Sequence, residues 1–159
     1  MVGRGALLQS LHCMKHVRKS VLLWYSPREM YDLVTAVAAY PDFLPWCDRA
    51  ELIAQHDDGV TARLGMAFGV VRHSFTTRNR QRPDESVRMS LVDGPFSRLD
   101  GGWRFRPLSD AQACKVEFEL RYEFANTAFE AVLSPVFDKA AGSFVDSFVR
   151  RAEQVYGAR

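Results

Sequence analysis

The chain has few cysteines, no long apolar run and almost no excess of charge of either sign. Its three cysteines (Cys13, Cys47 and Cys114) are far apart and show no CxxC spacing, which argues against a disulfide framework. No run reaches the roughly 18 apolar residues of a membrane-spanning helix. A net charge of +2 is too small to indicate nucleic-acid binding by itself. These absences favour a cytoplasmic protein kept in reducing conditions.

Side-chain sets that serve catalysis or bind metals are also missing. No carboxylate pair, Cys/His constellation or glycine-rich phosphate loop stands out. The only candidates are His73 and the pair Asp57-Asp58, which a strand position and a turn before Gly59 explain equally well. The four histidines lack metal-ligand spacing: His12, His16, His56 and His73. We therefore predict no catalytic residue, no metal site and no enzymatic activity.

The length of 159 residues indicates a single domain. Residues 1–13 carry one arginine and a short mixed stretch, too weak for a secretory signal. We expect them to form a flexible extension, with Met14 as an alternative start, and residues 14–157 to form the domain.

The first elements are predicted to be a strand and a short helix. Residues 15–25 alternate and are rich in Val, Leu and aromatic side chains, which favours a strand. Ser26, Pro27 and Glu29 then form an N-cap, a first-turn proline and a capping-box acid. We expect the helix to run past Val37 until Pro41 stops it. The following YPDFLPW has room for one short helical turn at most.

From about residue 48 to 125 the pattern predicts one antiparallel strand after another. Turn signals occur at Asp57-Asp58-Gly59, Arg82-Pro83-Asp84 and Asp93-Gly94-Pro95. Residues 60–70 alternate, with Val70 as the last inward residue. CKVEFELRYEF at 114–124 alternates completely, as a strand with one wet face does. Gly101-Gly102 predicts a bulge or a strand kink.

The last thirty residues change to a helical period. Their apolar residues fall in one wide stripe, which predicts a long helix counted from Pro135 to Tyr156, about 33 Å long. Pro135 is expected to kink this helix or to restart it with Ser134 as N-cap. Ala140 and Ala141 lie between bulky residues of the stripe. They either leave an internal space or permit close helix–sheet packing.

Six segments in this order resemble one family: YSPREMYDLV, YPDFLPWC, SFTTRN, VDGPFSRLDGGWRF, CKVEFELRYEF and FVRRAEQVYG. Over residues 14–157 the chain resembles the bacterial ribosome-association toxin and coenzyme-Q-binding protein family. That family lies in the START-like, helix-grip superfamily, which also bears the label polyketide cyclase. The resemblance implies an α+β fold: a curved antiparallel sheet of about six to seven strands around a long C-terminal helix. Two short helices would follow the first strand.

The resemblance also implies non-catalytic binding of an isoprenoid lipid, ubiquinone or a similar quinone, in the cavity between sheet and helix, in support of respiration. In this fold the segment after the first helix caps the cavity, so Phe43, Leu44 and Trp46 would form an apolar lid, with Phe96 meeting it from the opposite side. A plug at the end of the core is the alternative. The other expected lining residues are Phe68, Phe75, Trp103, Phe118, Tyr122, Phe144 and Phe148.

The alternative function that the family implies is binding of the large ribosomal subunit, in the manner of a toxin that blocks subunit association. Residues 72–106 hold eight arginines against four acidic residues. Arg78, Arg80 and Arg82 share one strand face and are the candidate rRNA contacts, although a solvated sheet face explains them as well. We expect a monomer without DNA as a partner, cytoplasmic or peripheral to the inner membrane through transient contact with its surface.

Overall fold

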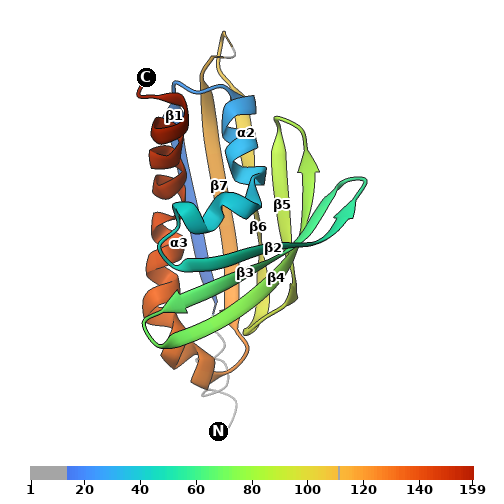
Figure 1. Ribbon diagram of the computed structural model, residues 1–159, viewed down its shortest axis with the longest axis vertical. Helices are drawn as coiled ribbons and strands as arrows, with labels where there is room; N and C mark the ends of the chain where they lie inside the picture. The colour runs from blue at the N-terminus through green and yellow to red at the C-terminus, as the bar shows by residue number, and fades with distance from the viewer. Residues whose placement is uncertain (1–13, 111) are drawn as a thin grey trace, which may run out of the picture.

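A computed structural model describes residues 14–110 and 112–159 of the chain (Figure 1). The predicted N-terminal extension, with His12 and Cys13, lies outside the described residues. The elements in chain order are β1 (Lys15–Leu23), α2 (Pro27–Thr35), η1 (Val37–Asp42), β2 (Cys47–His56), β3 (Gly59–Phe68), β4 (Val71–Arg82), β5 (Ser86–Asp93), β6 (Phe96–Pro107), β7 (Cys114–Phe124) and α3 (Thr127–Tyr156).

The strands form a single antiparallel sheet in the order β1-β7-β6-β5-β4-β3-β2. Figure 1 shows β2, β3 and β4 running across the direction of β7, because the sheet curls strongly. The helix α3 packs against β7 and β1, and α2 packs against α3 and β6. This is the START-like helix-grip arrangement that the resemblance implied, with two short helices after the first strand.

The first helix begins as predicted and ends earlier. Ser26 Oγ accepts from the Glu29 amide at 3.1 Å, and Glu29 Oε1 accepts from the Ser26 amide at 2.9 Å, which confirms the capping box. The strand before it ends at Leu23 instead of residue 25. The helix ends at Thr35, because the backbone of Ala36 leaves the helical region. Pro41 lies within the separate 3₁₀ helix η1 and does not end α2, contrary to the prediction.

Two details of the strands differ from the prediction. The strand β3 ends at Phe68, because Gly69 takes a φ of 62° and starts a tight turn; Val70 is 98% exposed on that turn. The expected bulge at Gly101-Gly102 is absent, since both residues keep register with β7. A Cβ on Gly101 would lie 2.1 Å from the Glu119 carbonyl oxygen. Glycine is therefore needed there for close strand approach.

The terminal helix starts eight residues before the predicted Pro135 and runs through it. Asn126 is the N-cap, and its Oδ1 accepts from the Phe129 amide at 2.8 Å. Pro135 removes a single backbone donor, and the remaining turns continue on both sides of it. Ser134 caps nothing; its hydroxyl donates to Asp138 Oδ2 at 2.9 Å.

The curved face of the sheet grips α3 through aromatic side chains and ion pairs. The Phe144 ring lies 5.3 Å from that of Phe118 and 5.6 Å from that of Trp103, which confirms that Phe144 faces the sheet. Along the edge of the sheet, Lys19 Nζ donates to Asp146 Oδ1 on α3 at 2.8 Å. These contacts fix which side of α3 faces the sheet around Phe144 and Asp146.

Candidate functional site

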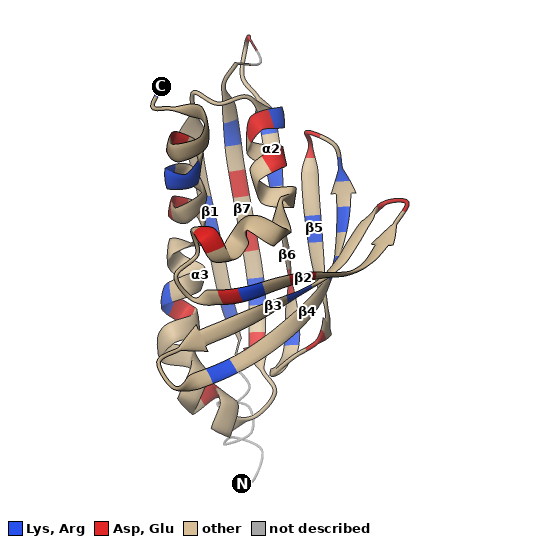
Figure 2. Ribbon diagram, in the orientation of Figure 1, with Lys and Arg blue, Asp and Glu red and all other residues tan. Residues whose placement is uncertain are grey.

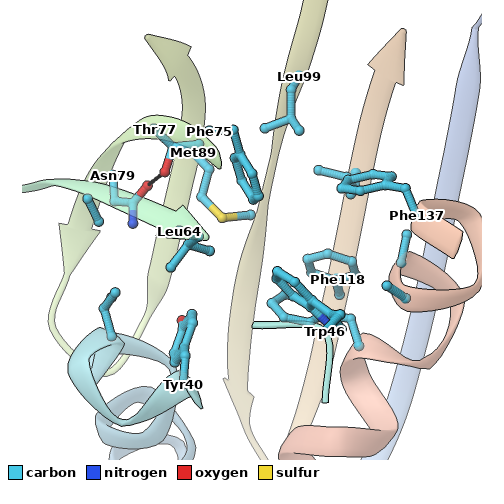
Figure 3. A pocket seen from close by; sticks show the side chains of 16 residues that line it. Tyr40, Trp46, Leu64, Phe75, Thr77, Asn79, Met89, Leu99, Phe118 and Phe137 are labelled. Atoms are coloured by element: carbon cyan, nitrogen blue, oxygen red, sulfur yellow. Dashed lines mark hydrogen bonds between the residues drawn. The ribbon is translucent and has the colours of Figure 1, made fainter. Parts of the chain in front are cut away.

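An apolar cavity lies between the concave face of the sheet and α3 (Figure 3). Its volume is about 60 Å³, room for only a few water molecules at roughly 10–15 Å³ each. The small residues Ala140 and Ala141 face it, so the helix stripe leaves an internal space at this point. The side chains that line it are Val37, Tyr40, Trp46, Ala62, Leu64, Phe75, Thr77, Asn79, Met89, Leu99, Phe118, Leu120, Phe137, Ala140, Ala141 and Phe144.

The polar side chains Thr77 and Asn79 of β4 interrupt this apolar lining. Both are buried, at 4% and 8% exposure, and Thr77 Oγ1 donates to Asn79 Oδ1 at 2.7 Å. Within the described part of the chain nothing accepts a hydrogen bond from Asn79 Nδ2. Figure 3 shows this nitrogen pointing away from Thr77, toward the side of the cavity where Tyr40 lies. The cavity thus presents a donor without a protein partner.

Sequence reasoning missed this pair, although a signal for it was present. Arg78 and Arg80 were placed together on the outer face of a strand. Because side chains alternate along a strand, Thr77 and Asn79 had to face inward with Phe75. Threonine and asparagine on the inner face of a core strand are polar groups that require a partner.

The segment predicted to form a lid divides into a buried and a half-buried part. Leu44 is only 1% exposed, and the Phe43 ring packs edge-on against Phe148 at 5.0 Å. Trp46 is half-buried, lines the cavity and lies 6.2 Å from the Phe144 ring. The carbonyl of Trp46 accepts from the Ala67 amide at 2.8 Å, which ties the segment to β3.

Four of the eleven predicted contact residues therefore reach the cavity: Trp46, Phe75, Phe118 and Phe144. Phe68 is half-buried at the end of β3, and the other six belong to the core around the cavity or its end: Phe43, Leu44, Phe96, Trp103, Tyr122 and Phe148. The ring of Phe96 packs on Phe75, Phe124 and Phe137, and none of its ring contacts among the described residues involves the predicted lid. Contact of these eleven side chains with a ligand stays a prediction.

Acidic and basic side chains lie away from the cavity. Of its described lining residues, none carries a carboxylate, an imidazole, an amine or a guanidinium group. The Tyr40 hydroxyl donates to the Val34 carbonyl at 2.5 Å, and burial raises its pKa above the ordinary range. Burial likewise raises the pKa of the Cys47 thiol to about 11, so this thiol is protonated at neutral pH.

The chemistry-bearing candidates from the sequence are dispersed. His73 lies edge-on against the Phe129 ring at 5.5 Å. Asp58 forms an ion pair with Arg78, whose hydrogen bond lowers the pKa of the carboxyl group. No three His, Cys, Asp or Glu side chains of residues 14–110 and 112–159 converge as a metal site.

The three predicted rRNA contacts are not equivalent. Arg78 is held by Asp58 and also donates to the Asn79 carbonyl at 2.8 Å. Arg80 lies 3.8 Å from Asp58, and Arg82 is exposed at the end of β4. Their contact with RNA stays a prediction.

Residues 23–149 match the family described as "Polyketide cyclase / dehydrase and lipid transport". The chain belongs to this family. It is 40% identical over 142 residues to a ribosome association toxin of Pseudomonas aeruginosa, covering 89% of this chain and 98% of that protein. A mitochondrial coenzyme Q-binding protein homolog of Xenopus laevis is 29% identical over 142 residues, covering 87% of this chain and 58% of that protein.

A solved START superfamily protein of Mycobacterium smegmatis has the same fold, with a TM-score of 0.69 and 21% identity. The alignment covers 88% of this chain and 98% of that protein. In the described part of this chain, no helix is long and apolar enough to cross a membrane.

Proposed function

We propose that the protein binds a hydrophobic isoprenoid quinone, ubiquinone or a close analogue, in the cavity between the sheet and α3, without chemical change to it, in support of respiration. The observation that carries this proposal is an apolar cavity with one polar pair, Thr77 and Asn79, in its wall. An apolar enclosure with a few oriented polar groups is the usual form of a small-molecule site. The Xenopus relative is named for the binding of coenzyme Q.

The free amide nitrogen of Asn79 specifies which polar group the ligand carries. It can only donate, so its partner is an acceptor such as a quinone carbonyl oxygen. Leaving a donor without a partner beside an apolar ligand costs about 1–3 kcal/mol. The site therefore favours a carbonyl-bearing ring over an isoprenoid hydrocarbon of the same length.

Binding requires the cavity to enlarge. Ligand pockets typically have volumes of roughly 300–1,000 Å³, far above the space of about 60 Å³ in the closed protein. Trp46 is one of three half-buried members of the wall, with Met89 and Phe144, and it alone of these lies in the segment between η1 and β2. Outward rotation of its ring would open the site while the buried Leu44 holds the segment to the core.

The same lining argues for binding in preference to catalysis, although the family description also names cyclases and dehydrases. Cyclisation and dehydration need a group that gives or takes a proton beside the ligand. The wall contains the Tyr40 hydroxyl, whose pKa is raised by burial. This hydroxyl already donates its hydrogen bond to the Val34 carbonyl. We infer that the ligand leaves the cavity unchanged.

Association with the large ribosomal subunit is the second candidate function. It is supported by the relatives named ribosome association toxins and by a charged hollow on the other face of the sheet, described below. The two functions use opposite faces of the sheet, so one chain can perform both.

A competition between a quinone and a hydrocarbon tests the first proposal. Binding of ubiquinone and of squalene, an isoprenoid hydrocarbon, would be measured by quenching of tryptophan emission and by native mass spectrometry. We expect the wild type to prefer ubiquinone, and Asn79→Leu to weaken ubiquinone binding about tenfold, a loss of about 1.4 kcal/mol, while squalene binding is kept.

The matched control is Ser147→Ala, which removes a buried hydroxyl of α3 that bonds the Ser143 carbonyl away from the cavity. It should leave both affinities unchanged. If neither ligand binds the wild type, or if Asn79→Leu lowers both affinities equally, the quinone proposal is wrong.

A further inference from the structure

The outer face of the sheet carries a broad hollow lined by charged residues. It has a volume of about 940 Å³ and lies over β4, β5, β6, β7 and β1. We call it the arginine hollow. Its outward charged side chains are Arg18, Arg80, Arg82, Arg88, Arg104, Arg121, Asp58, Asp100, Glu117 and Glu119. Lys19 also borders it, but its ammonium group is bound to Asp146 on α3.

The charge of the chain is concentrated in this hollow. Six arginines against four carboxylates give the outward side chains a formal charge of +2, which equals the net charge of all 159 residues. The remainder of the protein is therefore balanced. Figure 2 shows basic and acidic residues interspersed over the other elements.

Strand register brings three of these arginines together. Arg82 and Arg104 are both paired with Ser86, from the two sides of β5. Arg88 lies two residues further along β5, on the same face. Diagonal neighbours on adjacent strands are about 7–8 Å apart, so Arg88 is close to both Arg82 and Arg104. The sequence alone does not show this cluster, because its three arginines lie on three different strands, β4, β5 and β6.

These three guanidinium groups have no partner among the described residues, and all three are exposed. The other arginines of the hollow lie beside carboxylates: Arg121 donates to Glu119 at 3.1 Å, Arg18 lies 3.7 Å from the same carboxylate, and Arg80 lies 3.8 Å from Asp58. The arginines of the hollow that lack a carboxylate partner among the described residues are therefore gathered at one place, where Arg82, Arg88 and Arg104 meet.

Two features of the strands next to these arginines are unusual for a sheet surface. Arg80 lies directly opposite Arg88, and like charges in that position destabilise a sheet. Beside Arg88 stands Gly102, which has no side chain to cover the strand. A Cβ there would lie 2.6 Å from the Val87 carbonyl oxygen. At Gly102 the floor of the hollow is consequently bare backbone, directly beside the unpaired Arg88.

We propose that the arginine hollow binds the phosphate backbone of RNA, with Arg82, Arg88 and Arg104 as the phosphate contacts. The planar guanidinium group donates two parallel hydrogen bonds to phosphate oxygens. The identification of RNA rests on the second candidate function, association with the ribosome. Arg78, which is engaged by Asp58, contributes less than the sequence pattern suggested.

The shape of the hollow favours a strand of nucleic acid over a lipid surface. The hollow is recessed, with a volume of about 940 Å³, so it can enclose a segment of a negatively charged strand, whereas a bilayer presents a broad flat surface. Surfaces that bind anionic membranes also combine basic with exposed apolar side chains. None of the large exposed hydrophobic side chains in the described part of the protein lines this hollow.

The test compares two double variants that remove the same charge. Arg88→Gln with Arg104→Gln removes two of the proposed contacts. Arg49→Gln with Arg72→Gln removes two exposed arginines that pair with Glu51 and Asp48 outside the hollow. The probe is a fluorescent 20-nucleotide single-stranded RNA, titrated across a salt series, with phosphatidylglycerol vesicles as a parallel ligand. Circular dichroism verifies folding, and the single variants replace a double that fails to fold.

We expect R88Q/R104Q to weaken RNA binding about tenfold at low salt and to lower the slope of log affinity against log salt by about 1.4, roughly 0.7 for each lost contact. R49Q/R72Q should change neither. Equal weakening by both doubles would mean that net charge alone is sensed, and would overturn the proposal. Absence of RNA binding, or binding to the vesicles in its place, would do the same.

Co-sedimentation with large ribosomal subunits tests ribosome association separately from RNA binding by the arginine hollow. A wild type that does not sediment with the subunit refutes ribosome association, while a selective RNA loss in R88Q/R104Q still supports the hollow as an RNA site. Normal sedimentation of R88Q/R104Q places the ribosomal contact on another surface and overturns this assignment.

Discussion

Trp46 decides whether the YPDFLPWC segment opens the cavity or only closes the end of the core. A buried tryptophan removes about 200 Å² from water. Trp46 is half-buried, so its truncation removes about 100 Å² of buried surface, worth about 2.5 kcal/mol at roughly 25 cal/mol per Å². Trp103 is 2% exposed and packs 4.7 Å from the Phe118 ring. Its truncation should cost about 3–5 kcal/mol.

The assay measures stability and ligand response in the same protein. Urea denaturation would give the free energy of unfolding of Trp46→Ala and of Trp103→Ala as the buried control. Emission of Trp46, with Trp24 and Trp103 replaced by Phe, should shift to shorter wavelength when ubiquinone enters and dries the site. Trp46→Ala should also weaken ubiquinone uptake.

A stability loss for Trp46→Ala as large as that of Trp103→Ala, together with unchanged Trp46 emission on ubiquinone addition, would refute the opening role. The segment would then be a plug. Intermediate stability loss with a clear emission shift supports the lid.

Three further predictions concern particular residues. Gly101→Ala should lower the free energy of unfolding by about 2 kcal/mol or more, because its Cβ would meet the Glu119 carbonyl oxygen; an unchanged urea midpoint would contradict the close approach. His73→Ala should leave ubiquinone affinity within about twofold, since His73 lies outside the cavity wall; a tenfold loss would contradict the non-catalytic, apolar site. The hydrogen bond from Arg159 lowers the pKa of Glu29; its stabilisation is therefore full above the ordinary pKa of about 4.5 and is lost as pH falls below it. Melting temperatures of the wild type and Glu29→Gln should differ at pH 7, and the difference should shrink as the pH falls below the ordinary pKa of the carboxyl group; a constant difference would refute this linkage.

The cavity shows how far local patterns predict a site. Strand alternation places Phe118 of β7 inward, and the helical stripe places Phe144 beside it. Ala140 and Ala141 were recognised as positions where space could remain, and both line the cavity. Local patterns do not reveal that Trp46 and Asn79 belong to the same wall.

The sequence by itself determined the number and kind of elements, the capping box of α2 and the faces of the strands. These features depend on neighbouring residues, through the backbone period and through hydrogen bonds three residues apart. The helix start at Thr127, after the N-cap Asn126, escaped prediction because Ser134-Pro135 is an equally good local start signal.

Tertiary structure alone decided where the cavity and the arginine hollow lie. Both are built from residues on four or more elements. The curl of the sheet sets how far β4 stands from α3, and pairing between distant strands brings Arg82 to Arg104 across Ser86. Curvature and register arise from contacts distant in sequence, and a single strand, read alone, carries no information about the residues on the next.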